Sequence, residues 1–355
     1  MTSRNTSSTP GIELPGTGSL ERPGADAPPP RALIVSERHH GMRADAFLAL
    51  RLTRLTRNRA RAIVAAGGLR RGGRPLKPAS RVRRGESVTL ARRALDELPP
   101  QAPIAVLSDR DGLLVIDKPA HVVVHPTARY WRSALTQLLA AAGPDDDFAP
   151  RPCHRLDRET SGVLLLARTA EIERAVKAAF RRNAVHKSYL ALVDGRAEEE
   201  FVVDAPLAIG HGAIKMRMAP TPGAPPALTR FRRLLALGER SLVLAEPAHG
   251  RTHQIRAHLA LAGHPIVGDK IYGSQGESWF LRHAVGGERT APVAELAWPR
   301  QCLHAWRVEL PAGVDLETRC FSAPWPGDLP PLPCDLESLT GQPTASAAPA
   351  GSRSR

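Results

Sequence analysis

The sequence predicts an α+β protein: a main domain built on a mixed, mainly antiparallel sheet flanked by helices, preceded by a small α+β domain. Three observations predict this fold class. Apolar runs typical of strands outnumber helical segments in the second part of the chain, and their irregular spacing does not suit alternating parallel strands and helices. An Arg-rich segment with its own helix and hairpin signals precedes them. A polar, Pro-containing stretch separates the two parts.

The small domain is expected over residues 33–94. An apolar helical stretch around Phe47 is followed by Thr56, the expected N-cap of a second helix that ends at Gly67. The Gly pair at 72–73 stands between two short extended pieces, as in a tight hairpin, and "GESVTL" closes the unit with a strand. The sequence therefore predicts two helices packed with a small hairpinned sheet.

The main domain is expected over residues 105–330, after a linker at 95–104. The segments 1–32 and 331–355 are expected to be disordered tails, because Pro, Gly, Ser and Thr dominate them. Apolar runs predict strands, and helical periodicity predicts helices. The expected strands are 112–117, 162–167, 188–195, 241–247 and 302–310, and the expected helices are 133–142 and 171–182.

Composition limits the kind of protein. The four cysteines stand far apart without a C-x-x-C pair, which argues against a zinc cage or a disulfide framework and favours a reducing cytoplasm. The N-terminus has no apolar signal segment, and no run approaches the ~18 apolar residues of a membrane span. We expect a soluble cytoplasmic protein, with a monomer as the default.

The positive charge is concentrated in one segment. The chain carries a formal net charge of +14, and the stretch from His40 to Arg93 holds fourteen arginines and one lysine against two acidic residues. Such a segment is typical of a protein that binds a polyanion, because each neutralised phosphate releases condensed counterions. Arg57, Arg59 and Arg61 on the second helix are the candidate RNA contacts.

One carboxylate stands out in the main domain. The stretch "HRLDRETSG" puts charged side chains directly before the buried strand at 162–167. Asp157 is either an ordinary turn cap or a functional carboxylate. Burial near a sheet end raises the pKa of an Asp, whereas an Arg partner keeps it an anionic nucleophile.

A second motif, "GRTHQIRAH", predicts a helix with Thr252 as its N-cap and Arg256 near its start, where a rigid element holds an Arg well for gripping a carboxylate. The histidines around it do not have the spacing of a metal site, and no cofactor is expected. Ser161 lacks the G-x-S-x-G context of a serine nucleophile. Neither a Walker lysine loop nor a G-x-G-x-x-G motif is present.

Four ordered motifs, "DKPAHVVVHP", "HRLDRETSG", "HKSYLALVDG" and "GRTHQIRAHLALAGHPIVGDKIYG", together resemble the RluA-type family of RNA pseudouridine synthases. The resemblance covers about residues 105–330 and includes the trailing "LHAWRVEL" and "FSAPWPGDL". The Arg-rich segment resembles an S4-like RNA-binding domain, which many members of the family carry. One position departs from the family pattern: His121 stands where the family usually has Gly, and it would be strained if that site requires a positive φ.

The resemblance implies an isomerase that flips a uridine out of an RNA stem, breaks its N1–C1′ bond and rejoins the uracil through C5. It implies Asp157 as the catalytic residue, Tyr189 stacking on the flipped base and Arg256 pairing with Asp157. It also implies that Arg155 fills the space left by the nucleotide. The remaining candidate RNA contacts in the main domain are His154, Lys118 and Lys187.

Several alternatives stay open at this point. Asp157 could attack C1′, add to the pyrimidine ring or remove a ribose proton to give a glycal. The RNA could be large-subunit ribosomal RNA, which the S4-like module favours, or transfer RNA. A rival hypothesis is an RNA-binding protein without turnover; a metal-dependent deaminase is disfavoured by the ligand spacing.

Overall fold

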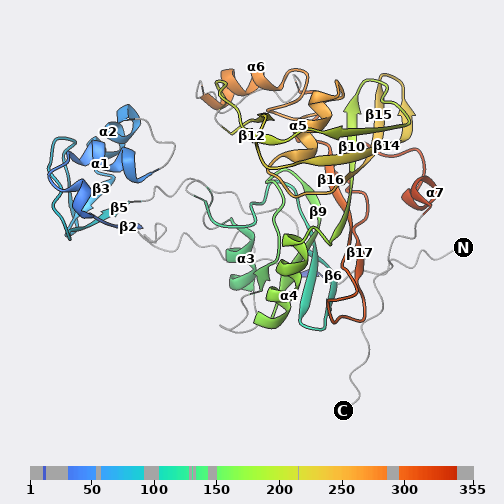
Figure 1. Ribbon diagram of the computed structural model, residues 1–355, viewed down its shortest axis with the longest axis horizontal. Helices are drawn as coiled ribbons and strands as arrows, with labels where there is room; N and C mark the ends of the chain where they lie inside the picture. Colours follow the sequence, from blue (N-terminus) through green and yellow to red (C-terminus); the bar gives the residue numbers. More distant parts are fainter. Residues whose placement is uncertain are drawn as a thin grey trace, which may run out of the picture. The chain divides into compact units, whose positions relative to one another are not determined.

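The computed structural model describes residues 11–12, 31–52, 57–91, 104–127, 130, 133–142, 150–214, 216–285 and 296–341, and the fold below is that of these residues (Figure 1). The chain divides into two compact units. The large unit comprises 1–14, 100–125 and 134–355, and the small unit comprises 15–99 and 126–133. Each unit is described by itself.

The small unit packs helices on a four-stranded antiparallel sheet of order β2-β5-β3-β4. Its core is made by apolar side chains of both helices and the sheet, among them Phe47, Val64 and Val88. Gly72 and Gly73 have φ of +53° and +78° and form the expected hairpin turn. Its elements are β2 (Arg31–Ile34), a 3₁₀ turn (Glu37–His39), α1 (Ala44–Arg51), α2 (Arg57–Ala65), β3 (Leu69–Arg71), β4 (Arg74–Pro75) and β5 (Ser87–Leu90).

The large unit is built on one mixed sheet of order β1-β6-β7-β9-β16-β10-β15-β14-β11. Strand β17 also pairs with β16, and β8 with β9. Every pairing is antiparallel except β16 with β9, which confirms the predicted fold class. The strands are β1 (Gly11–Ile12), β6 (Ile104–Arg110), β7 (Leu113–Lys118), β8 (Arg151–Pro152), β9 (Ser161–Ala167), β10 (His186–Asp194), β11 (Glu200–Asp204), β14 (Leu228–Leu237), β15 (Arg240–Pro247), β16 (Leu303–Glu309) and β17 (Cys320–Ser322).

Smaller elements complete the large unit. Strands β12 and β13 form a separate two-stranded antiparallel sheet. Figure 1 shows α3 and α4 near β6 and β9, and α5 and α6 near β10 and β12. These elements are α3 (Leu135–Ala142), α4 (Ala170–Arg181), β12 (Leu207–Ile209), β13 (Met218–Pro220), α5 (Gln254–Leu261), α6 (Gly276–Phe280), a π-helical turn (Leu281–Val285) and α7 (Leu336–Thr340).

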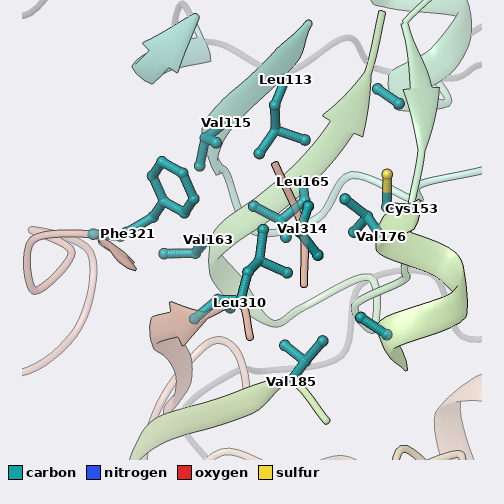
Figure 2. Packing of buried hydrophobic residues seen from close by; sticks show 14 residues of the cluster. Leu113, Val115, Cys153, Val163, Leu165, Val176, Val185, Leu310, Val314 and Phe321 are labelled. Atoms are coloured by element: carbon teal, nitrogen blue, oxygen red, sulfur yellow. The ribbon is translucent and has the colours of Figure 1, made fainter. Parts of the chain in front are cut away.

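Strand β9 is buried on both faces, and alternation along it separates two cores. Val163 and Leu165 pack with Val176 of α4 in one cluster, which Figure 2 shows together with Val115 of β7. The next residues along, Leu164 and Leu166, belong to a second cluster that contains the apolar residues of α3. Helices therefore cover both faces of this half of the sheet. This packing holds β9 in place and so fixes the end of the loop that leads into it.

The other half of the sheet is arranged in the same way. Val243 of β15 packs with Ile255 and Leu259 of α5. The neighbouring Leu244 faces the opposite cluster, which contains Leu336 of α7. Helix α5 is thus held against the sheet by its apolar residues, and this packing fixes the position of its first turn.

Two expectations about the chain ends are wrong. Gly11–Ile12, expected within a disordered tail, pairs with β6 as strand β1. Residues 331–341 were expected to belong to the other tail, but they contain α7, which begins at an Asp335 N-cap and buries Leu336. In both places a few apolar residues find a partner in the sheet, which a composition count over the whole segment does not detect. Thr56, the expected N-cap of the second helix, lies outside the described residues.

No helix of the described residues is long and apolar enough to cross a membrane.

Candidate active site

Asp157 lies in the loop between β8 and β9. The Thr160 N–H donates to the Asp157 carbonyl (3.2 Å), which closes a turn. Two buried basic side chains hold the carbonyls that follow: Lys118 Nζ donates to Arg158 O (3.4 Å), and Arg300 Nη1 donates to Glu159 O (3.2 Å). The loop is therefore tied to β7 and to the segment before β16, and the Asp157 side chain is presented from a rigid backbone.

The ion pair expected between Arg256 and Asp157 is present. Arg256, in the first turn of α5, is 6% exposed, and its Nη1 donates to Asp157 Oδ2 at 2.8 Å. Its other edge is held by Asp269, with Nε to Oδ2 at 2.6 Å and Nη2 to Oδ1 at 2.9 Å. Asp269 Oδ1 in turn accepts the N–H groups of Ile271 and Tyr272. A bidentate contact of this kind fixes the plane of the guanidinium, so that Nη1 is aimed at Asp157.

The charge of Asp157 is determined by two opposing effects. Burial alone would raise its pKa, but the Arg256 guanidinium, with smaller contributions from His253 and Arg155, holds the pKa below its ordinary value. Burial acts on Asp269 in the same direction and is likewise outweighed by Arg256. Both carboxyls are therefore ionised at neutral pH, and the site contains a partly buried carboxylate.

The carboxylate opens into a pocket of about 110 Å³. Asp157, Tyr189 and Arg155 line it together with Lys187 and the loop at 249–253. The Tyr189 ring lies between Ala245 of β15 and Ala305 of β16 in the sheet register. Because cross-strand partners share a face of the sheet, these two small neighbours leave room beside the ring. Burial, then the Asp157 charge, raises the pKa of Tyr189, which stays a neutral phenol.

Two of the predicted RNA contacts need correction. Lys118 is 0% exposed and donates to the carbonyls of Pro119, Val122 and Arg158, so it cannot reach an RNA phosphate. His154 Nε2 accepts the Leu165 N–H (3.1 Å), its ring stacks on Phe180, and burial lowers its pKa to about 3. Both side chains support the loop and β9. The sequence did not reveal this, because a motif does not distinguish polar residues that line a site from polar residues that hold the surrounding loop in place.

The other candidates lie at the pocket or on the surface of the small unit. Arg155 is exposed at the pocket, and Lys187 lines it with only 8% of its surface exposed. Burial lowers the pKa of Lys187 to about 8. Arg57 and Arg61 belong to the small unit, where both are exposed, and the Arg59 side chain lies outside the described residues.

The backbone around the site contains two left-handed residues that are not glycine. His121 has φ +66°, which is the positive angle that the family's usual Gly tolerates. His253 has φ +54° and is the N-cap of α5, in place of the predicted Thr252. Sequence reasoning also missed Asp269 and Tyr272, although both lie inside the quoted motif "GDKIYG"; the spacing of that motif does not say which side chains turn toward Arg256.

The site thus defines a class of protein: an enzyme with one ionised carboxylate, held by a buried Arg in a small pocket beside an aromatic ring. Among the described residues, no group of three or more His, Cys, Asp or Glu side chains could hold a metal ion.

Comparison with known proteins identifies the class more closely. A family model for RNA pseudouridylate synthase matches residues 112–261. The chain is 32% identical over 327 residues to the ribosomal large subunit pseudouridine synthase D of Nitrosomonas europaea, covering 89% of this chain and 90% of that protein. It is 34% identical over 305 residues to the protein of that name in Xanthomonas campestris pv. campestris, covering 84% and 90%. Among solved structures, human RNA pseudouridylate synthase domain containing 4 is similar at 26% identity and a TM-score of 0.49, covering 62% of this chain and 88% of that one.

The chain belongs to the RluA-type family of RNA pseudouridine synthases. It is therefore an isomerase that acts on uridine in RNA, as the motifs predicted.

Proposed function

We propose that this enzyme forms pseudouridine in large-subunit ribosomal RNA, with Asp157 as its catalytic residue. The observation that carries the proposal is the ionised Asp157 carboxylate, held by Arg256 in a pocket beside Tyr189. The names of the relatives support ribosomal RNA as the substrate. Transfer RNA is the alternative substrate that the sequence left open.

The chemistry requires the uridine to leave the RNA stack, because its N1–C1′ bond is out of reach inside a stem. Tyr189 stacks on the extruded base, since the small residues beside it leave its ring accessible. Arg155, exposed at the pocket, fills the space that the base vacates. Asp157 then acts on C1′, on the ring or on a ribose proton. The uracil turns while bound and is rejoined through C5, which then loses its proton, while N1, released from C1′, takes one up; no group is gained or lost and no cofactor is consumed.

Lys187 binds a phosphate of the target strand. Its Nζ is desolvated and donates to the His249 carbonyl at 3.3 Å. One hydrogen bond to a carbonyl does not offset the cost of burying an ammonium, so Lys187 favours an anionic partner. The phosphate backbone of an extruded nucleotide supplies one. We keep this role for Lys187 and do not propose it for Lys118 or His154.

The small unit is an S4-like RNA-binding module. Its two helices on a four-stranded antiparallel sheet agree with the predicted pattern, and its arginines, including exposed Arg57 and Arg61 on α2, supply the charge that attracts RNA. This module would provide most of the non-specific affinity, while the pocket selects the uridine. The cytoplasmic location and the monomeric state stay predictions.

Site-resolved pseudouridine mapping tests the proposal. RNA from cells that carry the native chain is compared with RNA from cells that carry Asp157→Asn. We expect specific sites in large-subunit ribosomal RNA to be lost in the mutant. Loss confined to transfer RNA would overturn the substrate proposal, and the survival of every site would overturn the role of Asp157.

A further inference from the structure

His253 stands beside the carboxylate in an unusual backbone conformation. Its φ of +54° is left-handed, which residues other than Gly, Asn and Asp seldom adopt. It is the N-cap of α5, but its side chain makes no capping hydrogen bond. The ring is nearly buried, with Nε2 3.9 Å from Asp157 Oδ2 and Nδ1 3.1 Å from Tyr272 Oη. The strained backbone therefore places an imidazole between a phenol and the catalytic carboxylate.

Tyr272 and Asp157 together favour one tautomer of His253. Tyr272 Oη accepts the Met218 N–H at 2.6 Å and can donate its O–H proton to His253 Nδ1. The other tautomer, in which Nδ1 donates to Oη, would turn the lone pair of Nε2 toward the Asp157 carboxylate, 3.9 Å away. Burial raises the pKa of Tyr272 to about 12, so the phenol keeps that proton. Burial, then Arg256, lowers the pKa of His253 to about 4, so the ring is neutral. A neutral ring that accepts at Nδ1 carries its hydrogen on Nε2, facing Asp157.

Two N–H groups consequently point at the same carboxylate oxygen. Arg256 Nη1 donates to Oδ2 at 2.8 Å, whereas His253 Nε2 lies 3.9 Å from Oδ2, beyond hydrogen-bond distance, and directs only its N–H dipole toward that oxygen. Among the described residues, no hydrogen bond to Oδ1 of Asp157 is found. The carboxylate is therefore held by one oxygen, and the other is left to the pocket.

We propose that His253, with its tautomer set by Tyr272, is a positioning residue that orients the Asp157 carboxylate so that Oδ1 faces the uridine. The proposal rests on the proposed catalytic role of Asp157. His253 acts through Asp157 and need not touch the RNA. It complements Arg256: the guanidinium supplies the charge and the hydrogen bond, and the neutral imidazole directs its N–H dipole at the same oxygen from another direction, 3.9 Å away.

Other groups also influence the titration of Asp157. Arg256 and Arg155 lower its pKa. Tyr189 and Lys118 interact electrostatically with Asp157, and Asp269 faces it across Arg256. All of these remain in place when His253 alone is changed, so a shift in the pH profile of that variant reports the loss of the imidazole.

The experiment compares His253→Ala, His253→Asn and Tyr272→Phe in the full chain, with single-turnover pseudouridine formation, RNA affinity and thermal unfolding measured for each. We expect His253→Ala to slow turnover about threefold at neutral pH, less than the loss of a direct hydrogen bond to a charged group would cost, because the contact is 3.9 Å long. Its acid limb should move to higher pH, because His253 lowers the pKa of Asp157, while RNA affinity stays unchanged. His253→Asn should recover part of the rate, because Asn tolerates the left-handed backbone and keeps an N–H donor.

Tyr272→Phe should slow turnover and move the acid limb in the same direction. The matched control is His258→Asn, on the same helix, where a buried His bonds Thr229 and the Ala205 carbonyl instead of facing Asp157. It should lower thermal stability and leave the acid limb in place.

An unchanged rate and acid limb in His253→Ala would overturn the proposal. So would a loss of RNA affinity without a loss of rate, because His253 would then bind RNA directly. If His253→Ala does not fold, His253→Asn and Tyr272→Phe provide the test. Failure of the proposed function looks different: Asp157→Asn would then retain activity, whatever the His253 variants do.

Discussion

At the scale of single residues, the site depends on one guanidinium shared between two carboxylates. Asp269 is 0% exposed and binds Arg256 by two hydrogen bonds, which leaves Nη1 for Asp157. A buried Arg paired only with Asp157 could rotate about its long side chain. Asp269 therefore determines the geometry of the Arg256–Asp157 pair without lining the pocket.

Asp269→Asn should destabilise the protein and slow turnover. Removing one partner of a buried ion pair typically costs about 3 to 5 kcal/mol of the free energy of unfolding. Urea denaturation measures this loss, and Glu277→Gln, which breaks the exposed pair with Arg217, is the control that should cost about 1 kcal/mol or less. Equal stability of the two variants would contradict the role of Asp269.

The Arg256–Asp269 pair also predicts how the free energy of unfolding changes at low pH. Because the folded pKa of Asp269 lies below its ordinary value, its contribution to stability is complete above the unfolded pKa of about 3.9. That contribution is lost as the pH falls through the lower folded pKa. The free energy of unfolding should therefore fall less steeply below pH 4 in Asp269→Asn than in the native chain. Parallel slopes in urea denaturation at several pH values would contradict this.

The lowered pKa of Lys187 predicts that RNA affinity depends on pH in the alkaline range. Its pKa of about 8 means that the ammonium loses its charge as the pH rises above 8, and phosphate binding should weaken with it. RNA affinity measured from pH 7 to pH 9 should fall in the native chain and not in Lys187→Arg, which stays charged. The same fall in both proteins would assign the effect to another group.

At the scale of elements, the loop that bears Asp157 leads into strand β9, and the start of that strand is crowded. Gly162 has φ +114°, and a Cβ there would meet the Ala305 carbonyl of β16 at 2.2 Å. This close approach occurs where β9 and β16 pair in parallel. The loop bearing Asp157 enters the sheet at this point, so the glycine is required for both packing and site geometry.

Gly162→Ala should cost about 3 kcal/mol or more, from the strained φ and the clash together. Gly238→Ala is the matched control: its φ is also positive, +61°, but nothing lies within 4 Å of its Cβ position. It should cost about 1 to 2 kcal/mol. Thermal or urea unfolding of both variants measures the difference, and an equal cost would show that the contact with β16 is relaxed without penalty.

The sequence predicted those elements whose signal is local. The apolar run at 162–167 corresponds to β9 (Ser161–Ala167), and the periodic segment at 171–182 corresponds to α4 (Ala170–Arg181). The longest strand, β14, was missed because its arginines interrupt the apolar run. Its alternation of buried Thr229 and Phe231 with exposed Arg230 was the available signal.

The site was predictable only as far as the family motifs go. Asp157, Arg256 and Tyr189 were named from those motifs, and they do line one pocket. The Asp269–Arg256 contact depends on how the chain after α5 folds back onto that helix, and the tautomer of His253 depends also on Asp157 in a distant loop; no local pattern encodes either. The burial of Lys118 was missed for the same reason, since a lysine beside a strand is usually exposed.

At the scale of the whole molecule, the basic segment and the carboxylate pocket lie in different units. The segment 40–93 carries a net charge of +13 and lies in the small unit, whereas the carboxylate pocket lies in the large unit. This division predicts that RNA affinity and turnover can be altered separately.

Replacing Arg57, Arg59 and Arg61 by Ala should weaken RNA binding and flatten its salt dependence, because fewer counterions are released. The charge-matched control replaces three arginines of the α4 region, Arg174, Arg181 and Arg182, which are exposed on the large unit. Binding isotherms at several salt concentrations measure both variants. An equal loss in the two would assign the effect to net charge instead of the small unit.

The most direct test of the account is single-turnover pseudouridine formation by the purified Asp157→Asn chain on an RNA that the native chain modifies, with RNA affinity measured on the same samples. The account predicts that product formation is abolished while affinity is retained, because Asp157 performs the chemistry and other residues bind the RNA. Product formation at the native rate would contradict it.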